Sequence, residues 1–500
     1  MTTRHQVPPV PDLRVAAAND APPRAAGAFV VYWMIASRRG GWNFGLQRAV
    51  EWAQRLDRPL VVLEALRAGY PWASDRLHAF VLQGMADNRR HFATKTALYY
   101  PYVEPSVGAG RGLIETLAAK AAVIVTDDFP AFFLRRMVAA SAARLPVRLE
   151  TVDSCGLLPL RATPRAYPTA YAFRRFLQKT LPSHLGDVPA PDPLSDVRLP
   201  VADLPGAVTR VWPEASDTLL SGHHGSLASL PIDHSVRVVE TRGGAAAAES
   251  TLTGFLDERL PRYPQDRVHP DHDASSGLSP YLHFGHVSAH EVFSALMTRE
   301  RWTTRALAHG ASGRREGWWG ASPAAEAFLD ELITWRELGY ATSHHQADCD
   351  RFESLPDWAR ATLAAHAADR RAHVYSLDEL ERARTHDRVW NAAQTQLVRE
   401  GRLHNYLRML WGKKILEWSA TPQDALATMI ELNNKYALDG RDPNSYSGIF
   451  WVLGRYDRPW APVRPIFGSI RYMSSENTLR KLRMKAYLQR YAASPTGLLA

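Results

Sequence analysis

Short apolar runs of strand length alternate with helical segments in the first part of the chain. Residues 29–34 read Phe-Val-Val-Tyr-Trp-Met, residues 60–63 read Leu-Val-Val-Leu, and residues 122–128 read Ala-Val-Ile-Val-Thr-Asp-Asp. A helical pattern follows the first run at residues 46–56. Uninterrupted apolar strands separated by helices indicate a parallel sheet covered on both faces. We therefore predict a doubly wound α/β domain over residues 28–160, without the G-x-G-x-x-G fingerprint of dinucleotide-binding domains.

Proline-rich segments flank this predicted domain. Residues 1–27 contain several prolines and lack the apolar core of a signal peptide, so we predict a disordered lead. Prolines recur from residue 182 to residue 213, and the segment closes on Gly243-Gly244. We interpret residues 161–245 as a long interdomain linker.

The rest of the chain, residues 246–500, has mostly helical periodicity, so we predict an all-helical second domain. The segment around 433–451 is polar and rich in turn residues, and we expect a loop there. Helices are predicted at residues 252–260, 287–296, 324–340, 359–368, 377–384, 389–400, 406–418, 422–432 and 478–491.

Composition narrows the class of protein. Lys and Arg total 60 against 51 Asp and Glu, and the resulting net charge of +9 favours a polyanionic partner. The 2 cysteines, Cys155 and Cys349, are too few for a disulfide framework or a cysteine-ligated cluster, which fits a cytoplasmic protein. No apolar stretch approaches the roughly 18 residues of a membrane span.

Two short motifs have the residue types of binding sites. The loop Ser275-Ser276-Gly277-Leu278-Ser279 offers hydroxyls and a flexible glycine ahead of a helical stretch, which suits phosphate oxygens but also suits an ordinary turn. His283, His286 and His290 are spaced to share a helix face, as in a metal site. No acidic or cysteine ligands accompany them except Glu291, which points elsewhere on a helix, so packing is the favoured interpretation and no metal is predicted.

The 15 tryptophans are the most informative residues. Trp390, Trp411 and Trp418 fall in two consecutive predicted helices, where packing is the first explanation and an electron relay between indoles is the second. Glu331 and Trp335 are four residues apart and share one face of a predicted helix. A basic run near the C-terminus favours a solvated face or phosphate contacts; it comprises Arg471, Arg480, Lys481, Arg483, Lys485 and Arg490.

Four blocks of the helical region carry a specific sequence pattern. They read V-W-N-A-A-Q at 389–394, H-N-Y-L-R-M-L-W-G-K-K-I-L-E-W at 404–418, Y-A-L-D-G-R-D-P at 436–443 and G-S-I-R-Y-M at 468–473. This pattern resembles the photolyase/cryptochrome family and, within it, most closely the class II cyclobutane pyrimidine dimer photolyases. The resemblance covers residues 250–490, where L-S-P-Y-L-H-F-G at 278–285 is similar to the wider family. It implies an antenna-type α/β domain joined by a long linker to a helical domain that binds FAD and DNA.

The resemblance assigns roles residue by residue. It implies FAD contacts at Tyr263, Ser275, Ser276, Gly277, Leu278, Ser279, Asn405, Arg408, Asp439 and Asp442, with Asn433 facing flavin N5. It implies an electron chain that runs from the flavin to the surface through Trp411, Trp390 and Trp418. It implies a pocket for the dimer at Glu331, Trp335, Met409 and Trp451, and a segment that enters the DNA at Asp457, Arg458 and Trp460.

The implied activity is light-driven repair of cyclobutane pyrimidine dimers in UV-damaged DNA. Excited FADH⁻ donates an electron to the flipped-out dimer, and Glu331, in its protonated form, donates a hydrogen bond to the dimer. We expect a monomer with a possible antenna chromophore of unknown identity. The alternatives are a cryptochrome-like blue-light photoreceptor with the same flavin and tryptophans, and a metal-dependent hydrolase built on the three histidines.

The chain departs from the class II pattern at two places. The segment D-N-W-A reads Gly41-Trp42-Asn43-Phe44, and L-N-D-[KR]-Y reads Leu432-Asn433-Asn434-Lys435-Tyr436. These departures bear on the antenna chromophore and on details of the lesion pocket more than on the flavin site. The segment after Trp451 is also one residue shorter than usual, which bears on the lesion pocket.

Overall fold

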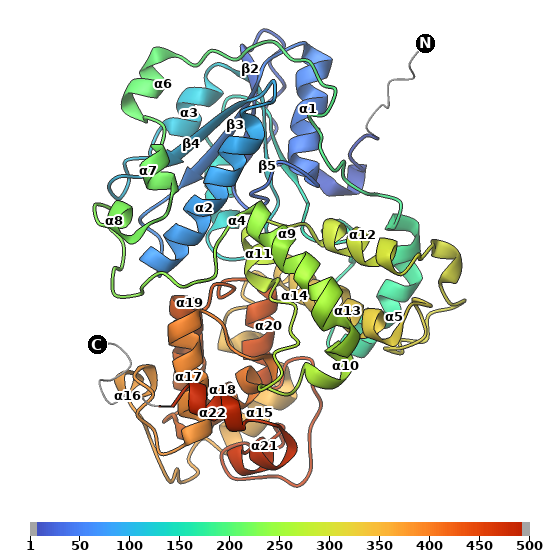
Figure 1. Ribbon diagram of the computed structural model, residues 1–500, viewed down its shortest axis with the longest axis vertical. Coiled ribbons are helices and arrows are strands. Elements are labelled where there is room, and N and C mark those ends of the chain that lie inside the picture. The colour runs from blue at the N-terminus through green and yellow to red at the C-terminus, as the bar shows by residue number, and fades with distance from the viewer. Residues whose placement is uncertain (1–7, 493–500) are drawn as a thin grey trace. The chain divides into compact units, whose positions relative to one another are not determined.

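The computed structural model describes residues 8–492 and divides into two compact units. The first, here called the sheet unit, comprises residues 1–164, 180–252 and 278–304. The second, the helical unit, comprises residues 165–179, 253–277 and 305–500. Figure 1 colours the chain by residue number, from blue at the N-terminus to red at the C-terminus. The sequence predicted single boundaries at 160 and 245. In the structure each unit is instead made of three separate segments, because the chain passes between the two units several times.

The sheet unit is built on six strands in the order β1-β6-β5-β2-β3-β4. Every neighbouring pair is parallel except β1 and β6, so the predicted parallel sheet is confirmed with one antiparallel edge strand added. The strands are β1 (Val15–Ala17), β2 (Phe29–Met34), β3 (Leu60–Leu66), β4 (Leu98–Val103), β5 (Ala121–Asp127) and β6 (Leu149–Val152).

Helices cover both faces of this sheet, as the uninterrupted apolar strands require. Val31 and Trp33 of β2 pack into one core with α3 (Leu113–Ala118) and α4 (Leu134–Ala142). Val30 and Tyr32, which alternate with them, pack into a second core with α1 (Phe44–Leu56). Helix α2 (Asp75–Phe92) also contributes to the second core, through Phe92.

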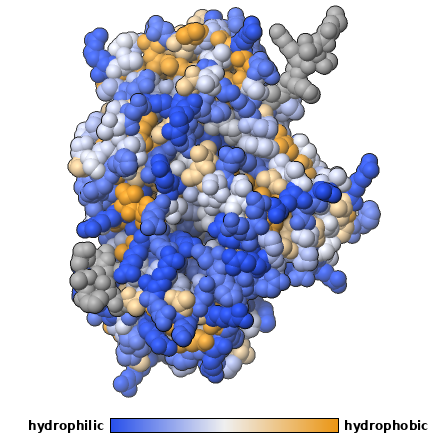
Figure 2. Space-filling view, viewed as in Figure 1, coloured by the Kyte–Doolittle hydropathy of each residue, from blue (hydrophilic) through white to orange (hydrophobic). Residues whose placement is uncertain are grey.

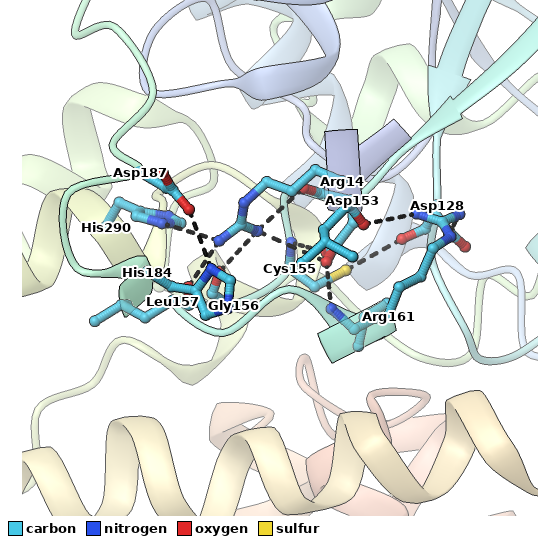
Figure 3. A network of polar contacts seen from close by, with 12 residues as sticks. Arg14, Asp128, Asp153, Cys155, Gly156, Leu157, Arg161, His184, Asp187 and His290 are labelled. Carbon is cyan, nitrogen blue, oxygen red and sulfur yellow. Dashed lines mark hydrogen bonds and ion pairs between the residues drawn. The ribbon is translucent and has the colours of Figure 1, made fainter. Parts of the chain in front are cut away.

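The predicted disordered lead is wrong for residues 8–27; residues 1–7 lie outside the described residues. β1 extends the sheet by pairing with β6. Just before β1, the fully buried Arg14 donates to three backbone carbonyls, those of Asp153 (3.3 Å), Gly156 (3.1 Å) and Leu157 (2.7 Å) (Figure 3). A buried guanidinium needs such acceptors, and together they fix the lead to the sheet unit.

The predicted linker 161–245 is also wrong as a free connector. Residues 165–179 belong to the helical unit, and residues 180–245 to the sheet unit. There, α7 (Asp217–Leu220) and α8 (His224–Leu227) pack on α2, and α6 (Gly206–Val211) packs on α3 (Figure 1). Leu220 and Leu227 are buried in this contact, so short apolar helices between the prolines attach the segment to the sheet unit.

The regular elements of residues 245–492 are all helices, as predicted, and α5 of the helical unit lies earlier in the chain. The helices are α5 (Ala170–Thr180) and then α9 (Ala245–Gly254), α10 (Tyr263–Asp266), α11 (Ser279–Phe284), α12 (Ala289–Arg299), α13 (Pro323–Leu329), α14 (Arg336–His345), α15 (Asp357–Ala365), α16 (Leu377–Glu381), α17 (Arg388–Glu400), α18 (Asn405–Trp418), α19 (Pro422–Tyr436), α20 (Pro443–Val452), α21 (Ser475–Lys481) and α22 (Lys485–Arg490). Two π-helical segments, η4 (Phe255–Arg259) and η7 (Asp330–Trp335), interrupt this series.

Three details differ from the predicted helices. α20 occupies part of the predicted loop 433–451, because Asp442 caps its N-terminus and Pro443 stands at its first position. The predicted helix 478–491 is two short helices, α21 and α22. Helices α11 and α12 belong to the sheet unit rather than to the helical unit.

The three histidines of α11 and α12 do not converge. His290 lies 3.5 Å from the Arg14 guanidinium (Figure 3), whereas His286 accepts from the Gly244 backbone N–H (2.9 Å) and stacks on Phe80. His283 contacts Phe129 edge to face. Among residues 8–492, no group of three His, Cys, Asp or Glu side chains is placed to hold a metal ion, so the hydrolase hypothesis loses its site.

Hydrophilic side chains cover most of the face drawn in Figure 2, and apolar side chains form small separate patches on it. Within the described residues, every helix is too short or too polar to cross a membrane. Cys155 and Cys349 form no disulfide and belong to different units.

Candidate functional site

The candidate site is built on three neighbouring helices of the helical unit. α20 packs against both α14 and α18. Two glycines permit this close approach: a Cβ on Gly339 of α14 would lie 2.5 Å from Ser447 Oγ, and a Cβ on Gly412 of α18 would lie 2.6 Å from a Val452 methyl. Both partner residues are on α20, so the glycines set the distance between the helices that carry the predicted pocket residues.

The four predicted pocket residues come from these helices and from the π-helical turn ahead of α14. Glu331 and Trp335 lie in η7, Met409 lies on α18, and Trp451 lies on α20. All four are partly exposed, as contacts to a ligand from solution require. A π-helical turn is a rare local structure that occurs often at functional sites.

Glu331 has a partner that the sequence analysis missed. Its Oε1 accepts from Arg267 Nη1 at 2.5 Å, and the Arg267 guanidinium lies over the Tyr263 ring, 5.3 Å from its centroid. The expected Glu331 is free to donate to the dimer, whereas in the structure its carboxyl group forms an ion pair with Arg267. Arg267 therefore belongs to the site as the group that orients Glu331.

The three predicted relay tryptophans lie in contact. The Trp390 and Trp411 indoles stack with centroids 6.5 Å apart, and the Trp390 and Trp418 indoles meet edge to face at 5.6 Å. Trp390 is thus the middle member, as the predicted order requires. Hydrogen bonds fix the first two rings: Trp390 Nε1 donates to the Trp411 carbonyl (3.0 Å), and Trp411 Nε1 donates to Gln394 Oε1 (2.9 Å).

Trp418, at the outer end of the predicted electron relay, is covered by other side chains. Trp418 is only 2% exposed, and it contacts Tyr375 and His386, both at 5.4 Å between ring centroids. His386 is exposed, and its Nδ1 lies 2.6 Å from the Tyr375 hydroxyl. The predicted surface position of Trp418 is therefore taken by these two residues.

A second cluster of predicted residues surrounds the buried amide of Asn433. Its Nδ2 donates to Asn434 Oδ1 (3.1 Å) and to Ser445 Oγ (3.0 Å). Both amide hydrogens are thus engaged, and the Asn433 amide oxygen accepts from the same Ser445 hydroxyl at 3.4 Å, which leaves one of its two lone pairs for a further donor. Arg408 forms an ion pair with Asp439 at 3.1 Å and donates to Ser445 Oγ at 3.3 Å.

The remaining predicted cofactor residues are more dispersed. Asp442 caps α20 and accepts from the Tyr340 hydroxyl (2.8 Å), whereas Asn405 is exposed at the start of α18. Tyr263 is buried against Phe255 and Phe328. In the predicted phosphate loop, Ser275, Ser276 and Gly277 belong to the helical unit, while Leu278 and Ser279 belong to the sheet unit, where Ser279 begins α11.

The segment after α20 combines aromatic and charged side chains. Asp457 accepts from Arg471 Nε (3.0 Å) and from Trp460 Nε1 (3.1 Å). Burial acts to raise the pKa of Asp457, but these hydrogen bonds outweigh it and hold that pKa below its ordinary value. The Arg471 guanidinium lies 3.9 Å from the Trp460 centroid, and Arg458 lies 4.7 Å from it. Exposed cations continue beyond this segment at Arg464, Arg480, Lys481, Arg483, Lys485 and Arg490.

Comparison with known proteins identifies the family. A deoxyribodipyrimidine photo-lyase of Methanothermobacter thermautotrophicus is 34% identical over 95% of this chain and 97% of its own length. Relatives with the same name in Oryza sativa and Arabidopsis thaliana are 34% and 33% identical, each over 92% of this chain and over 87% and 88% of their own lengths. The chain belongs to the photolyase/cryptochrome family.

A solved structure extends this likeness to the fold. A bacterial class III photolyase from Agrobacterium tumefaciens superposes with a TM-score of 0.65 over 93% of this photolyase-family chain and 86% of its own, at 18% sequence identity. No family model matches the sequence.

Family membership implies FAD, and the donor set of the helical unit fits that cofactor. A pyrophosphate requires cations, hydroxyls and N–H groups, and Arg402, Ser275 and His404 supply them in this photolyase-family chain. Arg402 and Ser275 both contact Asp273, at 2.8 and 2.9 Å. Burial lowers the pKa of His404 to about 4, and its Nδ1 has no hydrogen-bond partner within the described residues. An unpaired buried nitrogen beside these donors is a place for a polar ligand atom.

Several contributors had weak or absent sequence signals. Arg267, Gln394, Ser445 and Tyr375 act through tertiary contacts, and no local spacing marks them. Lys413 stands inside the family-like block 404–418, where a lysine among buried positions was a signal available in the sequence.

Proposed function

We propose that this protein repairs cyclobutane pyrimidine dimers in DNA with light, by the electron-transfer chemistry of class II photolyases. The observation that carries the proposal is the packing of α20 against both α14 and α18, because η7, α18 and α20 carry the four residues of the predicted dimer pocket: Glu331, Trp335, Met409 and Trp451. The sequence blocks 389–394, 404–418, 436–443 and 468–473 support class II, because they follow that pattern.

Reduced FAD, when bound and excited, supplies the electron that opens the cyclobutane ring. The residues of this chain position and protect that chemistry. Asn433 would offer its amide oxygen to a bound flavin, and the Arg408–Asp439 pair would hold a cation at the same site. The contacts among Trp411, Trp390 and Trp418 would carry electrons from an external reductant toward the flavin site, which would keep a bound flavin in its reduced state.

The DNA partner is bound by charge and held by aromatic surfaces. The exposed cations from Arg458 to Arg490 supply phosphate contacts that depend on salt rather than on sequence. A dimer disturbs base stacking and is flipped out at a cost of a few kcal/mol, lower than for an intact pair. Trp335 and Trp451 then provide apolar faces for it, and the Arg267–Glu331 pair provides polar contacts at its carbonyl and N–H groups.

The test is illumination of the reduced, flavin-loaded protein with an oligonucleotide that carries one thymine dimer. We expect light-dependent loss of the dimer, with no loss in darkness. If the dimer persists while the flavin is photoreduced normally, the protein is a cryptochrome-like receptor instead. An absorption spectrum of the same sample reports the flavin and any antenna chromophore.

A further inference from the structure

A buried lysine contacts Trp451, one of the residues of the proposed lesion pocket. Lys413 of α18 is 0% exposed, and its Nζ donates to the Val452 carbonyl at 2.6 Å. Val452 is the last residue of α20, so the ammonium group caps the negative end of that helix. The same Nζ lies over the Trp451 indole, 5.0 Å from its centroid.

Trp451 is the first ring in an alternating series of cations and indoles. Arg471 lies 5.4 Å from the Trp451 centroid and 3.9 Å from the Trp460 centroid. Arg458 then lies 4.7 Å from the Trp460 centroid. The series Lys413–Trp451–Arg471–Trp460–Arg458 therefore links the base of the pocket to the segment assigned to enter the DNA. A contact between a cation and an indole is strongest where water is excluded, as it is at Lys413.

We propose that Lys413 is a positioning residue for Trp451, whose indole its ammonium group holds by a cation–π contact while it carries a proton. Arg471 and the other arginines of the series stay charged at every pH, so Lys413 is the member that can switch. When Lys413 loses its proton, the cation–π contact with Trp451 is lost, whereas the hydrogen bond to the Val452 carbonyl remains. The consequence for DNA binding rests on the proposed function; the effect on Trp451 itself does not.

The surroundings place this switch in the physiological range. Burial lowers the pKa of Lys413 to about 7, the charge of Arg471 acts in the same direction, and the carboxylate of Asp457 opposes both. α17 and α19 also pack against α18, and within the described residues they present no charged group that shifts Lys413. The neighbouring Lys414 is directed elsewhere, to Glu417 at 2.9 Å and to the Trp418 ring. We therefore expect Lys413 to be mostly charged at pH 6 and mostly neutral at pH 8.5.

The first experiment needs no DNA. Tryptophan fluorescence of the flavin-loaded protein is followed from pH 5.5 to 9, and the same titration of Trp451→Phe is subtracted to isolate Trp451. We expect a transition near pH 7 that Lys413→Met abolishes and that the matched control Lys414→Met retains. A Trp451 transition that survives in Lys413→Met, or its absence from the wild-type protein, overturns the proposal.

The second experiment measures the ratio of affinities for a duplex with one thymine dimer and for the undamaged duplex. This ratio cancels the phosphate contacts, and we expect it to fall about thirtyfold between pH 6 and pH 8.5, the size of one desolvated cation–π contact. Lys413→Met should give the low ratio at both pH values, and Lys413→Arg the high ratio at both. A wild-type ratio that does not change with pH, or an unchanged slope in both variants, contradicts the inference.

The outcomes separate this inference from the proposed function. If the wild-type protein binds neither duplex, or repairs no dimer in light, the proposed function is wrong. The fluorescence titration then still tests whether Lys413 positions Trp451. If Lys413→Met does not retain flavin, the wild-type titration and Lys413→Arg carry the test. A wild-type transition together with a pH-independent ratio in Lys413→Arg supports the proposal.

Discussion

The indole planes of Trp390 and Trp411 are within 3° of parallel, although the two residues come from different helices. Trp390 is 0% exposed and Trp411 is 2% exposed, and each indole N–H has a fixed acceptor. This arrangement keeps two oxidisable rings in contact and away from water. The relay and the packing interpretations of these tryptophans consequently differ in what a conservative substitution should do.

Trp390→Phe and Trp411→Phe test the relay directly. Phenylalanine keeps an aromatic ring in the core but is much harder to oxidise, so each variant should lose photoreduction of oxidised flavin, by at least tenfold in rate. Repair by chemically reduced protein should stay near the wild-type level. The control is Trp212→Phe, which replaces a buried tryptophan of the sheet unit, 8% exposed. Normal photoreduction in both relay variants would leave packing as the role of these rings.

Gln394→Leu removes the acceptor of the Trp411 indole. Gln394 is 0% exposed, so the change leaves a buried N–H without a partner at a cost of about 1–3 kcal/mol. We expect a urea unfolding midpoint lowered accordingly and slower photoreduction, with flavin content retained. The matched change Gln396→Leu, at a buried glutamine on the same helix bonded to Tyr487, should lower stability alone. Equal photoreduction rates in the two variants would deny Gln394 a role in the relay.

Glu331→Ala should lower the yield of repair without emptying the flavin site. The substitution leaves Arg267, half-buried over Tyr263, without its carboxylate partner, so the polar wall of the pocket loses its fixed geometry. Repair per absorbed photon is measured with the dimer-containing oligonucleotide at saturating concentration. Asp330→Ala, which breaks the adjacent ion pair with Arg174, serves as the control for damage to η7. Full repair by Glu331→Ala removes this residue from the pocket.

The sequence was sufficient for elements whose signal is local. Uninterrupted apolar strands predicted the parallel sheet, and helical periodicity predicted the helices that carry the tryptophans. α20 was missed because its polar start was interpreted as a loop, although Asp442-Pro443 is a typical capping pair for a helix. The lead and the linker were wrong for a related reason. Proline-rich composition indicates loops, but Arg14 and the leucines of α7 and α8 find partners far away along the chain.

The candidate site shows the same division. The resemblance named the tryptophans and their order, but the contacts that hold Trp390 between Trp411 and Trp418 depend on how α17 lies against α18. Arg267 and Gln394 act across 64 and 17 positions of the chain, and no spacing rule reaches that far. Geometry of this kind follows from tertiary packing alone.

Buried histidines should make the sheet unit sensitive to acid. Burial lowers the pKa of His78 to about 4 and that of His286 to about 3. Since each depressed pKa means that the unfolded chain binds a proton near pH 6.5 and the folded chain does not, stability is complete above that pH and falls below it. Each histidine should cost about 2 kcal/mol between pH 7 and pH 5.

Urea unfolding at the two pH values measures this effect. His78→Gln should reduce the difference between pH 7 and pH 5 by about 2 kcal/mol. The control is His223→Gln, at an exposed histidine, and should leave the difference unchanged. An identical acid response in wild type and His78→Gln would show that His78 is not buried in its neutral form.

Asn434 stands where the class II pattern has aspartate, and the change bears on the flavin. Asn434 is 0% exposed; its Oδ1 accepts from Asn433, and its Nδ2 donates to the Tyr446 hydroxyl at 3.0 Å. An aspartate can keep both contacts, because the Tyr446 hydroxyl can donate instead of accept. Asn434→Asp therefore adds a buried negative charge next to Asn433 without removing a hydrogen bond.

That charge should disfavour an added electron on the flavin. We expect the reduction potential of the bound flavin to fall in Asn434→Asp, and photoreduction to slow, with stability reduced by the cost of burying the carboxylate. Potentiometric titration of the purified protein measures the shift. Asn444→Asp places the same charge at an exposed position of α20 and should leave the potential unchanged. A shift of equal size in both variants would point to long-range charge rather than to the Asn433–Asn434 contact.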